Sequence, residues 1–411
     1  MEDNLIAETE FGIILNKTGV EMNQLFHKQF WVVCLILSLI LWSCKSKISS
    51  KEDCEIINLL QSETVLSLDD YIESIETINL EPDPVRVVYP KKLLISGNRI
   101  FVLASGQVYS FDESGRFMNY VGRKGNGPDE YLFILDCCIS LDKRTILCLD
   151  NKNTVYRYSI KDGCFVDKTA TMEKGTSSVV IPMKDDGFGL FFANPPDNQI
   201  NDYENEFYCL KLFNKNGDLQ GEQLLREDYN ILMSFRSQAI QESRNEYILS
   251  YLPGDGICYI CDDGEINPLF YLSFDGKGLP IGFTKNSQDP FLMIGDIFDS
   301  EYYKSPSSVC QTSSLLFCSA FGAHSSYINF LFNKDTYRGI RWQSYGNEAP
   351  PMSALCADDN YFYFTFEESS LSIDSPDAIP DPFIRTLVTR YGVSKSEDDN
   401  PLIIKVKFKI P

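Results

Sequence analysis

Histidine is almost absent from this chain. Only His27 and His324 occur among its 411 residues, so a metal site built from several histidines is excluded. Basic residues are also scarce, because 37 Lys and Arg stand against 58 Asp and Glu and give a net charge of −21. Nucleic-acid binding needs a basic surface, and we therefore expect no nucleic-acid partner.

The sequence also lacks an apolar run as long as the about 20 residues that a membrane-spanning helix needs. The uncharged run Phe30–Trp42 has 13 residues. It follows the weakly basic stretch Met22–Lys28 and ends in Leu41-Trp42-Ser43-Cys44, so it resembles the signal peptide and lipobox of bacterial lipoproteins. The resemblance implies that Cys44 carries the lipid and becomes the mature N-terminus. The alternative is a buried apolar helix of the folded domain.

The leader divides the chain into four predicted parts. Residues 1–21 contain five acids and only one lysine, the wrong charge for the start of a signal peptide, so we place them upstream of the true start. Residues 22–43 are the predicted signal peptide and residues 44–65 a polar tether. Residues 66–411 are the folded domain.

Short apolar strands recur through the folded part, with a turn rich in Asp, Asn and Gly after each third strand. The turn glycines Gly115, Gly163, Gly217 and Gly264 are spaced by 48, 54 and 47 residues, and looser copies follow at 315–335 and 361–408. One propeller blade needs four short strands, and this period of about 50 residues supplies them. We predict an all-β, six-bladed β-propeller of four-stranded antiparallel blades; a pair of β-sandwiches is the alternative. Helical patterns are confined to 54–80.

The linker between the first two copies carries a family resemblance. It reads Val121-Gly-Arg-Lys-Gly-Asn-Gly-Pro-Asp-Glu-Tyr131. This Gly-Arg-x-Gly-x-Gly-Pro-x-Glu-Tyr pattern resembles the six-bladed β-propeller lipoproteins of Bacteroidetes, which are related to NHL-repeat propellers. The resemblance implies that residues 67–90 supply a strand to the last blade and close the ring. It leaves the ligand open.

The residues after Cys44 indicate which side of the outer membrane the domain faces. Surface-exposed lipoproteins of this phylum resemble one another in having acids soon after the lipidated cysteine. Here Lys45 and Lys47 come first, and the first acid is Glu52. We therefore expect the periplasmic face of the outer membrane.

Four residues of the linker are candidate ligand contacts. A phosphate-binding loop is disfavoured, because Pro128 removes one N–H group and no helix follows the glycines. The linker is instead expected to cross between blades. Arg123, Lys124, Glu130 and Tyr131 are then predicted to border a ligand pocket on the face where such linkers emerge.

A second candidate group follows the fifth copy. Arg338, Arg341 and Trp342 combine two guanidinium groups with an aromatic ring, which suits sugar rings or carboxylated ligands. The alternative is that Trp342 packs between blades. His324 lies at an expected turn and is either a lone general base or a hydrogen-bonding residue.

The 13 cysteines do not predict a metal or redox centre. Cys258 and Cys261 have CxxC spacing, but in a strand these positions point to opposite faces. We expect the cysteines other than Cys44 to be mostly core residues. The acidic turn residues Asp296, Asp299 and Glu301 do not match a calcium-binding spacing. No cofactor and no metal site are predicted.

The sequence favours a monomeric lipoprotein, held on the membrane by its lipid, whose propeller binds a small molecule, glycan, peptide or protein non-covalently. The alternative is a propeller lyase or hydrolase acting on a glycan. Because propellers host both classes, the fold cannot decide between them.

Overall fold

The computed structural model describes residues 54–192, 207–225, 240–243, 246–250, 254–262, 264–280, 282–283, 290–304, 306–322, 326–344, 352–366, 379, 381–394 and 399–410. Residues 51–411 form one compact unit. The predicted leader and its Cys44 lie outside the described residues.

Blades 1 to 3 each consist of four consecutive antiparallel strands. Blade 1 is β4 (Pro90–Ser96), β5 (Arg99–Ala104), β6 (Gln107–Asp112) and β7 (Phe117–Val121). Blade 2 is β8 (Ile134–Ile139), β9 (Thr145–Asp150), β10 (Thr154–Ser159) and β11 (Phe165–Ala170). Blade 3 is β12 (Val179–Pro182), β13 (Phe188–Phe191), β14 (Tyr208–Phe213) and β15 (Leu219–Leu225).

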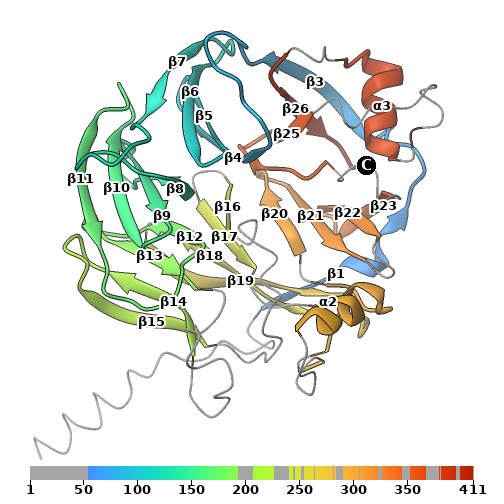
Figure 1. The fold of residues 1–411 in the computed structure, drawn as a ribbon. Coiled ribbons are helices and arrows are strands. Elements are labelled where there is room, and N and C mark those ends of the chain that lie inside the picture. The colour runs from blue at the N-terminus through green and yellow to red at the C-terminus, as the bar shows by residue number, and fades with distance from the viewer. Residues whose placement is uncertain are drawn as a thin grey trace, which may run out of the picture. The chain divides into compact units, whose positions relative to one another are not determined.

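Blades 4 to 6 complete the ring (Figure 1). Blade 4 is β16 (Ile240–Ser243), β17 (Glu246–Ser250), β18 (Gly256–Asp262) and β19 (Glu265–Ser273). Blade 5 is β20 (Pro306–Gln311), β21 (Leu315–Phe321), β22 (Tyr327–Asn333) and β23 (Arg338–Ser344). Blade 6 is β24 (Cys356–Ala357), β25 (Phe362–Phe366), β26 (Leu402–Phe408) and the N-terminal β3 (Ile72–Asn79). The predicted six-bladed, all-β propeller is confirmed.

The ring is closed by the N-terminal segment of the described chain. Strand β3 pairs antiparallel with β26 along its whole length, so the closure that the family resemblance implied is confirmed. Two further strands precede it: β1 (Glu55–Asn58) lies parallel to β19 and β2 (Glu63–Thr64) lies parallel to β23, with the 3-10 turn η2 (Leu59–Gln61) between them. We call residues 55–79 the N-terminal belt, since they add one strand each to blades 4, 5 and 6.

The belt includes residues 55–64, which the sequence interpretation assigned to the tether. Arg341 of β23 holds this stretch, because its Nε donates to Thr64 Oγ1 at 2.9 Å and its Nη1 to the carbonyl of Leu60 at 3.0 Å. A Cβ added at Gly339 would lie 2.5 Å from Ser62 Oγ, so the belt crosses β23 in close contact. Residues 55–64 therefore belong structurally to the propeller.

The repeated turn glycines join neighbouring blades. Gly115, Gly163 and Gly217 have φ of +86°, +70° and +89°. A Cβ at these positions would lie 2.0, 2.3 and 2.7 Å from the carbonyl oxygens of Asn79, Tyr120 and Ala170, each at or near the end of the preceding blade's outer strand. Only glycine allows both the positive φ and the contact. The turn glycines that repeat in the sequence are therefore the points at which one blade contacts the main chain of the preceding blade.

Two junctions use the belt in place of a glycine turn. The turn of blade 5 between β22 and β23, residues 334–337, contains no glycine, and in blade 6 the corresponding connection is the long segment 367–401. At these two junctions β1 and β2 lie along the outer strands of the preceding blades. The belt thus supplies a main-chain contact at both junctions.

The hydrophobic core lies between blades, because strands such as β8, β9 and β12 bury both faces, whereas the outer strands β7, β11 and β15 are largely exposed. Cys137 and Cys138 are adjacent in β8, yet Cys137 packs in the cluster shared with blade 1 and Cys138 in the cluster shared with blade 3. Cys258 and Cys261 of β18 likewise belong to different clusters, as predicted from their spacing. Nine of the eleven cysteines in the described residues are buried, and none of the eleven forms a disulfide.

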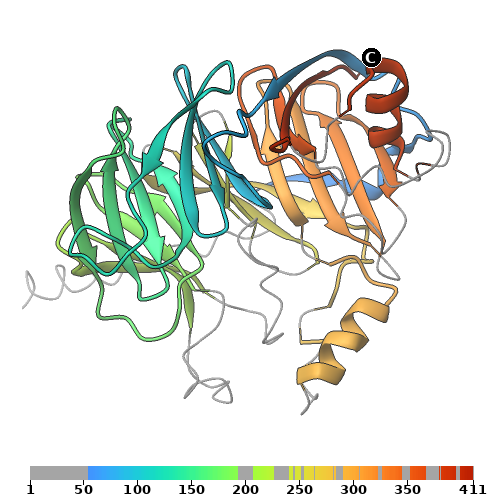
Figure 2. The same cartoon turned by 45° about the horizontal axis from the view of Figure 1, so that its top comes forward.

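The helix prediction for 54–80 is wrong. That stretch forms the belt, whereas the helices α2 (Pro290–Asp299) and α3 (Pro382–Tyr391) lie in two connecting segments. Asp381 caps α3 by accepting the N–H groups of Phe383 and Ile384, and Gly392 ends it at φ +64°. Figure 2 shows α2 standing off the blades. Pairing with existing strand edges determined the conformation of the belt more strongly than its local apolar spacing did.

We expect Gly163→Ala to lower the free energy of unfolding by about 2–4 kcal/mol, because it combines a strained φ with a clash against blade 1. Gly97→Ala is the matched control, since Gly97 also has a positive φ but no atom lies within 4 Å of the place that a Cβ would take there. The control should cost only about 1–2 kcal/mol. Denaturant unfolding measures both, and equal losses would contradict the docking role.

Candidate ligand-binding site

The linker between blades 1 and 2, residues 122–133, is a closed loop wedged between the two blades. Its start is fixed by the N–H of Gly122, which donates to the carbonyl of Gly163 at 3.0 Å. The loop then folds back on itself: Tyr131 N donates to the carbonyl of Arg123 at 3.1 Å, and Gly125 N to the carbonyl of Tyr131 at 3.0 Å. We call this segment the linker loop.

The carboxylate of Glu130 organises the interior of the linker loop. Its Oε2 accepts the N–H of Gly127 at 2.8 Å. A Cβ at Gly125 would lie 1.9 Å from the same oxygen, which explains why glycine stands at that position of the motif. Glu130 is therefore a structural residue of the loop that also borders the pocket described below.

Tyr131 pins the loop to blade 1. The side chain is only 1% exposed, and its hydroxyl donates to the carbonyl of Val121 at 2.9 Å while accepting from Gln107 Nε2 at 2.5 Å. Burial, with the nearby Cys148 and Tyr158, raises the pKa of this phenol well above its usual range. Tyr131 therefore stays protonated and serves as a hydrogen-bonding anchor.

Blade 2 holds the other side of the linker loop. The hydroxyl of Tyr158 donates to the carbonyl of Asp129 at 3.1 Å, and Lys168 Nζ donates to the carbonyl of Pro128 at 2.7 Å. Lys168 also lies 5.4 Å from the ring centre of Tyr156, its cross-strand neighbour. The loop is consequently tied to both blades.

A pocket of about 420 Å³ opens between the linker loop and blade 2. It is lined by Gly125, Asn126, Gly127, Glu130, Tyr131, Leu132, Asp150, Asn151, Lys152, Thr154, Tyr156, Lys168 and Ala170. We call it the linker pocket. It lies over β10 and β11 of blade 2 and is polar on most sides.

The charged side chains of the linker pocket differ in how far hydrogen bonds within the protein engage them. Glu130 accepts a loop N–H, and Asp150 Oδ1 accepts the N–H groups of Lys152 and Thr154 at 2.8 and 2.9 Å. Burial, and then the Asp150 carboxylate, raise the pKa of Tyr156. Lys152 and Lys168 are exposed residues that line the pocket, and Lys168 uses one of its three N–H groups on the carbonyl of Pro128. The arrangement therefore suits a ligand with an anionic group.

The predicted site residues fall into separate groups. Glu130 and Tyr131 border the linker pocket, whereas Arg123 and Lys124 do not. Lys124 turns toward blade 1, where its Nζ donates to the carbonyl of Ser105 at 2.7 Å. His324 lies outside the described residues.

The second predicted group lies on β23, the outer strand of blade 5, and not on a linker. Arg341 holds the belt, and Trp342 is fully buried against Phe317 and Phe383, with ring centres 6.0 and 6.2 Å away. Trp342 thus offers no exposed ring to a ligand. The structure does not bring this group to the linker pocket.

Sequence reasoning missed the blade 2 side of the pocket, chiefly Asp150, Lys152 and Lys168. The order of strands around the β9–β10 hairpin already indicates these residues. Because antiparallel strands alternate in direction, the β9–β10 turn lies at the same end of blade 2 as the linker that enters β8. Polar residues of that turn were therefore candidates to face the linker.

The inner strands near the ring centre carry a buried ionic link. Lys92 Nζ of β4 lies 2.9 Å from Asp136 Oδ1 of β8, and Asp136 Oδ2 accepts the N–H of Val180 in β12 at 3.0 Å. Burial works to lower the pKa of Lys92, but the Asp136 carboxylate and neighbouring groups raise it overall. These charges join three blades and are not open to a ligand.

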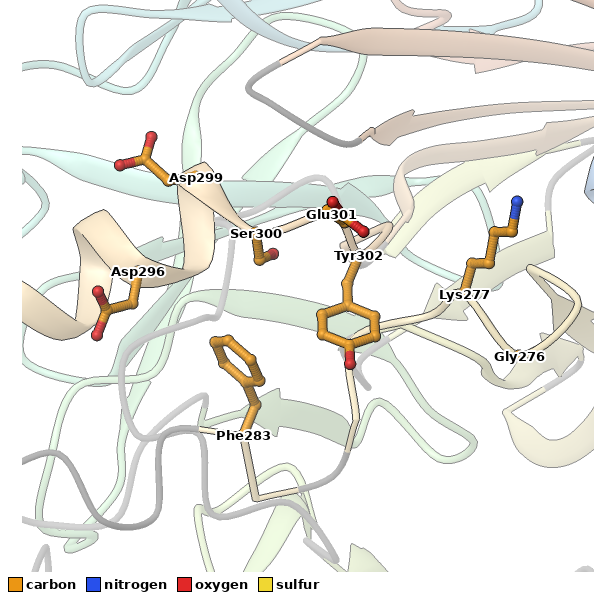
Figure 3. A pocket seen from close by; sticks show the side chains of 8 residues that line it. All are labelled: Gly276, Lys277, Phe283, Asp296, Asp299, Ser300, Glu301 and Tyr302. Carbon is orange, nitrogen blue, oxygen red and sulfur yellow. The ribbon is translucent and has the colours of Figure 1, made fainter.

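A second pocket of about 710 Å³ lies beside α2 (Figure 3). Phe283 and Tyr302 stand side by side with ring centres 5.6 Å apart, and the acidic residues of α2 lie to one side of them. Within the described residues no group of His, Cys, Asp and Glu is placed to hold a metal ion. The pocket lies between blades 4 and 5 in sequence and shares no residue with the linker pocket.

Lys304 closes the end of α2. The residue is 0% exposed, and its Nζ donates to the carbonyls of Gly322 at 2.9 Å and Ser300 at 3.2 Å. Burial lowers the pKa of this ammonium group to about 8, although the nearby Asp299 carboxylate acts in the opposite direction. The charged form is therefore held at a cost to stability.

Residues 54–407 match the family described as Domain of unknown function (DUF4934). The chain belongs to this family. No curated protein matches the DUF4934 chain in sequence. In the part of the chain that the structure describes, no helix is long and apolar enough to cross a membrane.

Two solved structures share the fold of this DUF4934 protein. The crystal structure of a protein from Bacteroides fragilis, described as an exported one, has a TM-score of 0.68 and 21% sequence identity, and the match covers 86% of this chain and 100% of that one. A member of the DUF4221 family from Bacteroides vulgatus has a TM-score of 0.53 and 10% identity, with 82% and 97% covered. At these identities the likeness shows the fold alone.

We expect the free energy of unfolding of this DUF4934 protein to increase between about pH 8 and about pH 10, because the pKa of Lys304 is lower in the folded than in the unfolded chain. In that window the unfolded chain keeps the proton that the folded chain has lost, so deprotonation favours folding by up to about 3 kcal/mol. Unfolding free energies of wild type and Lys304→Met across this range measure the effect. The variant should lack this rise, and parallel pH profiles would contradict the assignment.

Proposed function

We propose that this DUF4934 protein is a lipoprotein of the outer membrane, anchored through Cys44, whose propeller binds a ligand non-covalently at the linker pocket. The ligand is a small molecule, glycan, peptide or protein segment that presents an anionic group. The domain faces the periplasm and acts as a monomeric binding module.

The proposed location is supported by the leader and by one comparison. Phe30–Trp42 is too short to span a bilayer and ends at a cysteine in a lipobox-like context. The similar Bacteroides fragilis structure is described as that of an exported protein. Two or more acyl chains on one cysteine would hold the protein stably on a membrane.

The linker pocket carries the binding proposal. Its two carboxylates accept backbone N–H groups of their own loops, while Lys152 and Lys168 are exposed residues of the lining, with Lys168 donating one N–H to the carbonyl of Pro128. A hydrolase or lyase needs carboxylates or a base aimed at a substrate. In the linker pocket the acids are used to shape the loops, and we therefore favour binding over the glycan-enzyme alternative.

The anchoring is tested by Cys44→Ala in the native host. We expect wild type in the detergent phase and labelled by a radioactive or clickable fatty acid, and the variant in neither. A control variant, Cys34→Ala in the apolar run, should keep the label, since its thiol precedes the cleavage site. A labelled Cys44→Ala protein would contradict the proposal.

Ligand binding is tested by screening a glycan array and a displayed library of short random peptides against the purified chain. For any ligand found, we expect Lys152→Gln and Lys168→Gln each to weaken binding by about tenfold or more, because each removes a charge-assisted contact. Lys161→Gln is the matched control, because Lys161 is also exposed but lies in the β10–β11 turn. Failure of both screens, or equal effects of the three variants, would contradict the proposed site.

A further inference from the structure

Two short segments at the loop end of blade 1 expose four large apolar side chains. Val88 and Tyr89, just before β4, are 42% and 75% exposed, and Leu132 and Phe133, at the end of the linker loop, are 57% and 45% exposed. We call these four residues the apolar strip. Clustered exposed apolar residues on a monomer are typical of an interaction surface.

The β5–β6 turn of blade 1 holds the two halves of the strip together. Ser105 Oγ donates to the carbonyl of Val88 at 3.2 Å, and Ile134 N donates to the carbonyl of Gly106 at 3.1 Å. A Cβ at Gly106 would lie 2.3 Å from the ring of Phe133, so the ring rests directly on this turn. The turn therefore holds the two segments of the strip side by side, with Tyr89 and Leu132 as the chain neighbours of Val88 and Phe133.

Tyr89 has a strained backbone conformation. Its φ is +52°, a region that bulky residues rarely adopt. Yet the side chain is 75% exposed and gains little from burial. Strained backbone at an exposed aromatic residue is more typical of a binding surface than of a stabilising contact.

The strip continues into the linker pocket. Leu132 belongs to both, and beyond it lie Lys152 and Lys168. On the strip itself Lys124 Nζ lies 5.9 Å from the ring centre of Phe133 and is fixed on the carbonyl of Ser105. A ligand that spans strip and pocket would therefore meet apolar surface bordered by ammonium groups, in a protein whose net charge is −21.

We propose that the strip and the linker pocket together bind one extended segment of a partner protein, with apolar side chains on the strip and a carboxylate in the pocket. This inference rests on the proposed binding function and names its ligand class. Apolar anchors with complementary charge beside them are the usual basis of peptide recognition.

The composition of the strip favours a peptide over the other ligands. Val88 and Leu132 are aliphatic, whereas sugar rings are bound chiefly by aromatic faces and hydrogen-bonding side chains. A lipid surface with anionic headgroups would be repelled by the acidic chain as a whole. The peptide is thus the ligand for which both the apolar residues and the lysines have a role.

The test uses peptides selected from the displayed random library, with the glycan array and vesicles of phosphatidylethanolamine and phosphatidylglycerol as the other probes. We expect selected peptides to combine apolar residues with an acid or a free C-terminal carboxylate. Their affinity, measured by fluorescence anisotropy, should fall about tenfold in Leu132→Ser and in Tyr89→Asn. Asparagine tolerates the positive φ at position 89, so this change removes the ring without adding strain.

Leu219→Ser is the matched control, because Leu219 is 45% exposed but lies on β15 of blade 3. It should leave peptide affinity unchanged. A ligand whose binding depends on Lys152 and Lys168 but not on Leu132 or Tyr89 would overturn the peptide inference and leave the proposed function intact. Binding to glycans or vesicles without peptide binding would also overturn it, and failure of all three probes would overturn both proposals.

Discussion

The contact between a turn glycine and the preceding outer strand is the constraint on which the rest of this structure depends. Gly115, Gly163 and Gly217 each bring a turn within contact distance of a carbonyl on the neighbouring blade. The glycines let main chain approach main chain, which limits the spacing of the blades, and the apolar clusters pack between them. At the junctions of blades 4 and 5 and of blades 5 and 6, β1 and β2 lie along the outer strands β19 and β23. The belt therefore contributes main-chain contacts at two of the six junctions.

The candidate site is a consequence of that geometry. Because Gly163 docks on blade 1, the linker loop has a fixed path from β7 to β8, and Glu130 and Tyr131 hold it from inside. The loop then presents two different surfaces. Toward blade 2 it borders a polar pocket with Lys152 and Lys168, and toward blade 1 it exposes Leu132 and Phe133 beside Tyr89. A single rigid loop can thus place an apolar and an anionic part of one ligand side by side.

The sequence predicts the fold better than the site. The repeat length, the turn glycines and the alternating strands identify the blades, because each reflects a local requirement of the backbone. The positions of Cys258 and Cys261 on opposite faces of their strand are local in the same way and were predicted correctly. Local patterns did not find the belt. Strands β1 and β2 were not predicted, and the closing strand Ile72–Asn79 was expected only from the family resemblance, since it pairs with β26 at the far end of the chain. For the same reason Glu130 was found by its motif, but Lys168, which donates to the carbonyl of Pro128 in the same loop, was not. Arg341 and Trp342 looked like a ligand platform, and only the structure shows that one holds the belt and the other fills the core.

Amide hydrogen exchange of the linker loop tests the central claim most directly. If glycine docking fixes the loop, the N–H groups of Gly122, Gly125, Gly127 and Tyr131 should exchange as slowly as those of the flanking strands β7 and β8, without any ligand, since each donates a hydrogen bond within the protein. Gly163→Ala should accelerate these four amides more than the amides of blades 4 and 5. Exchange of the loop at the rate of an open surface segment in the wild-type protein would contradict the account.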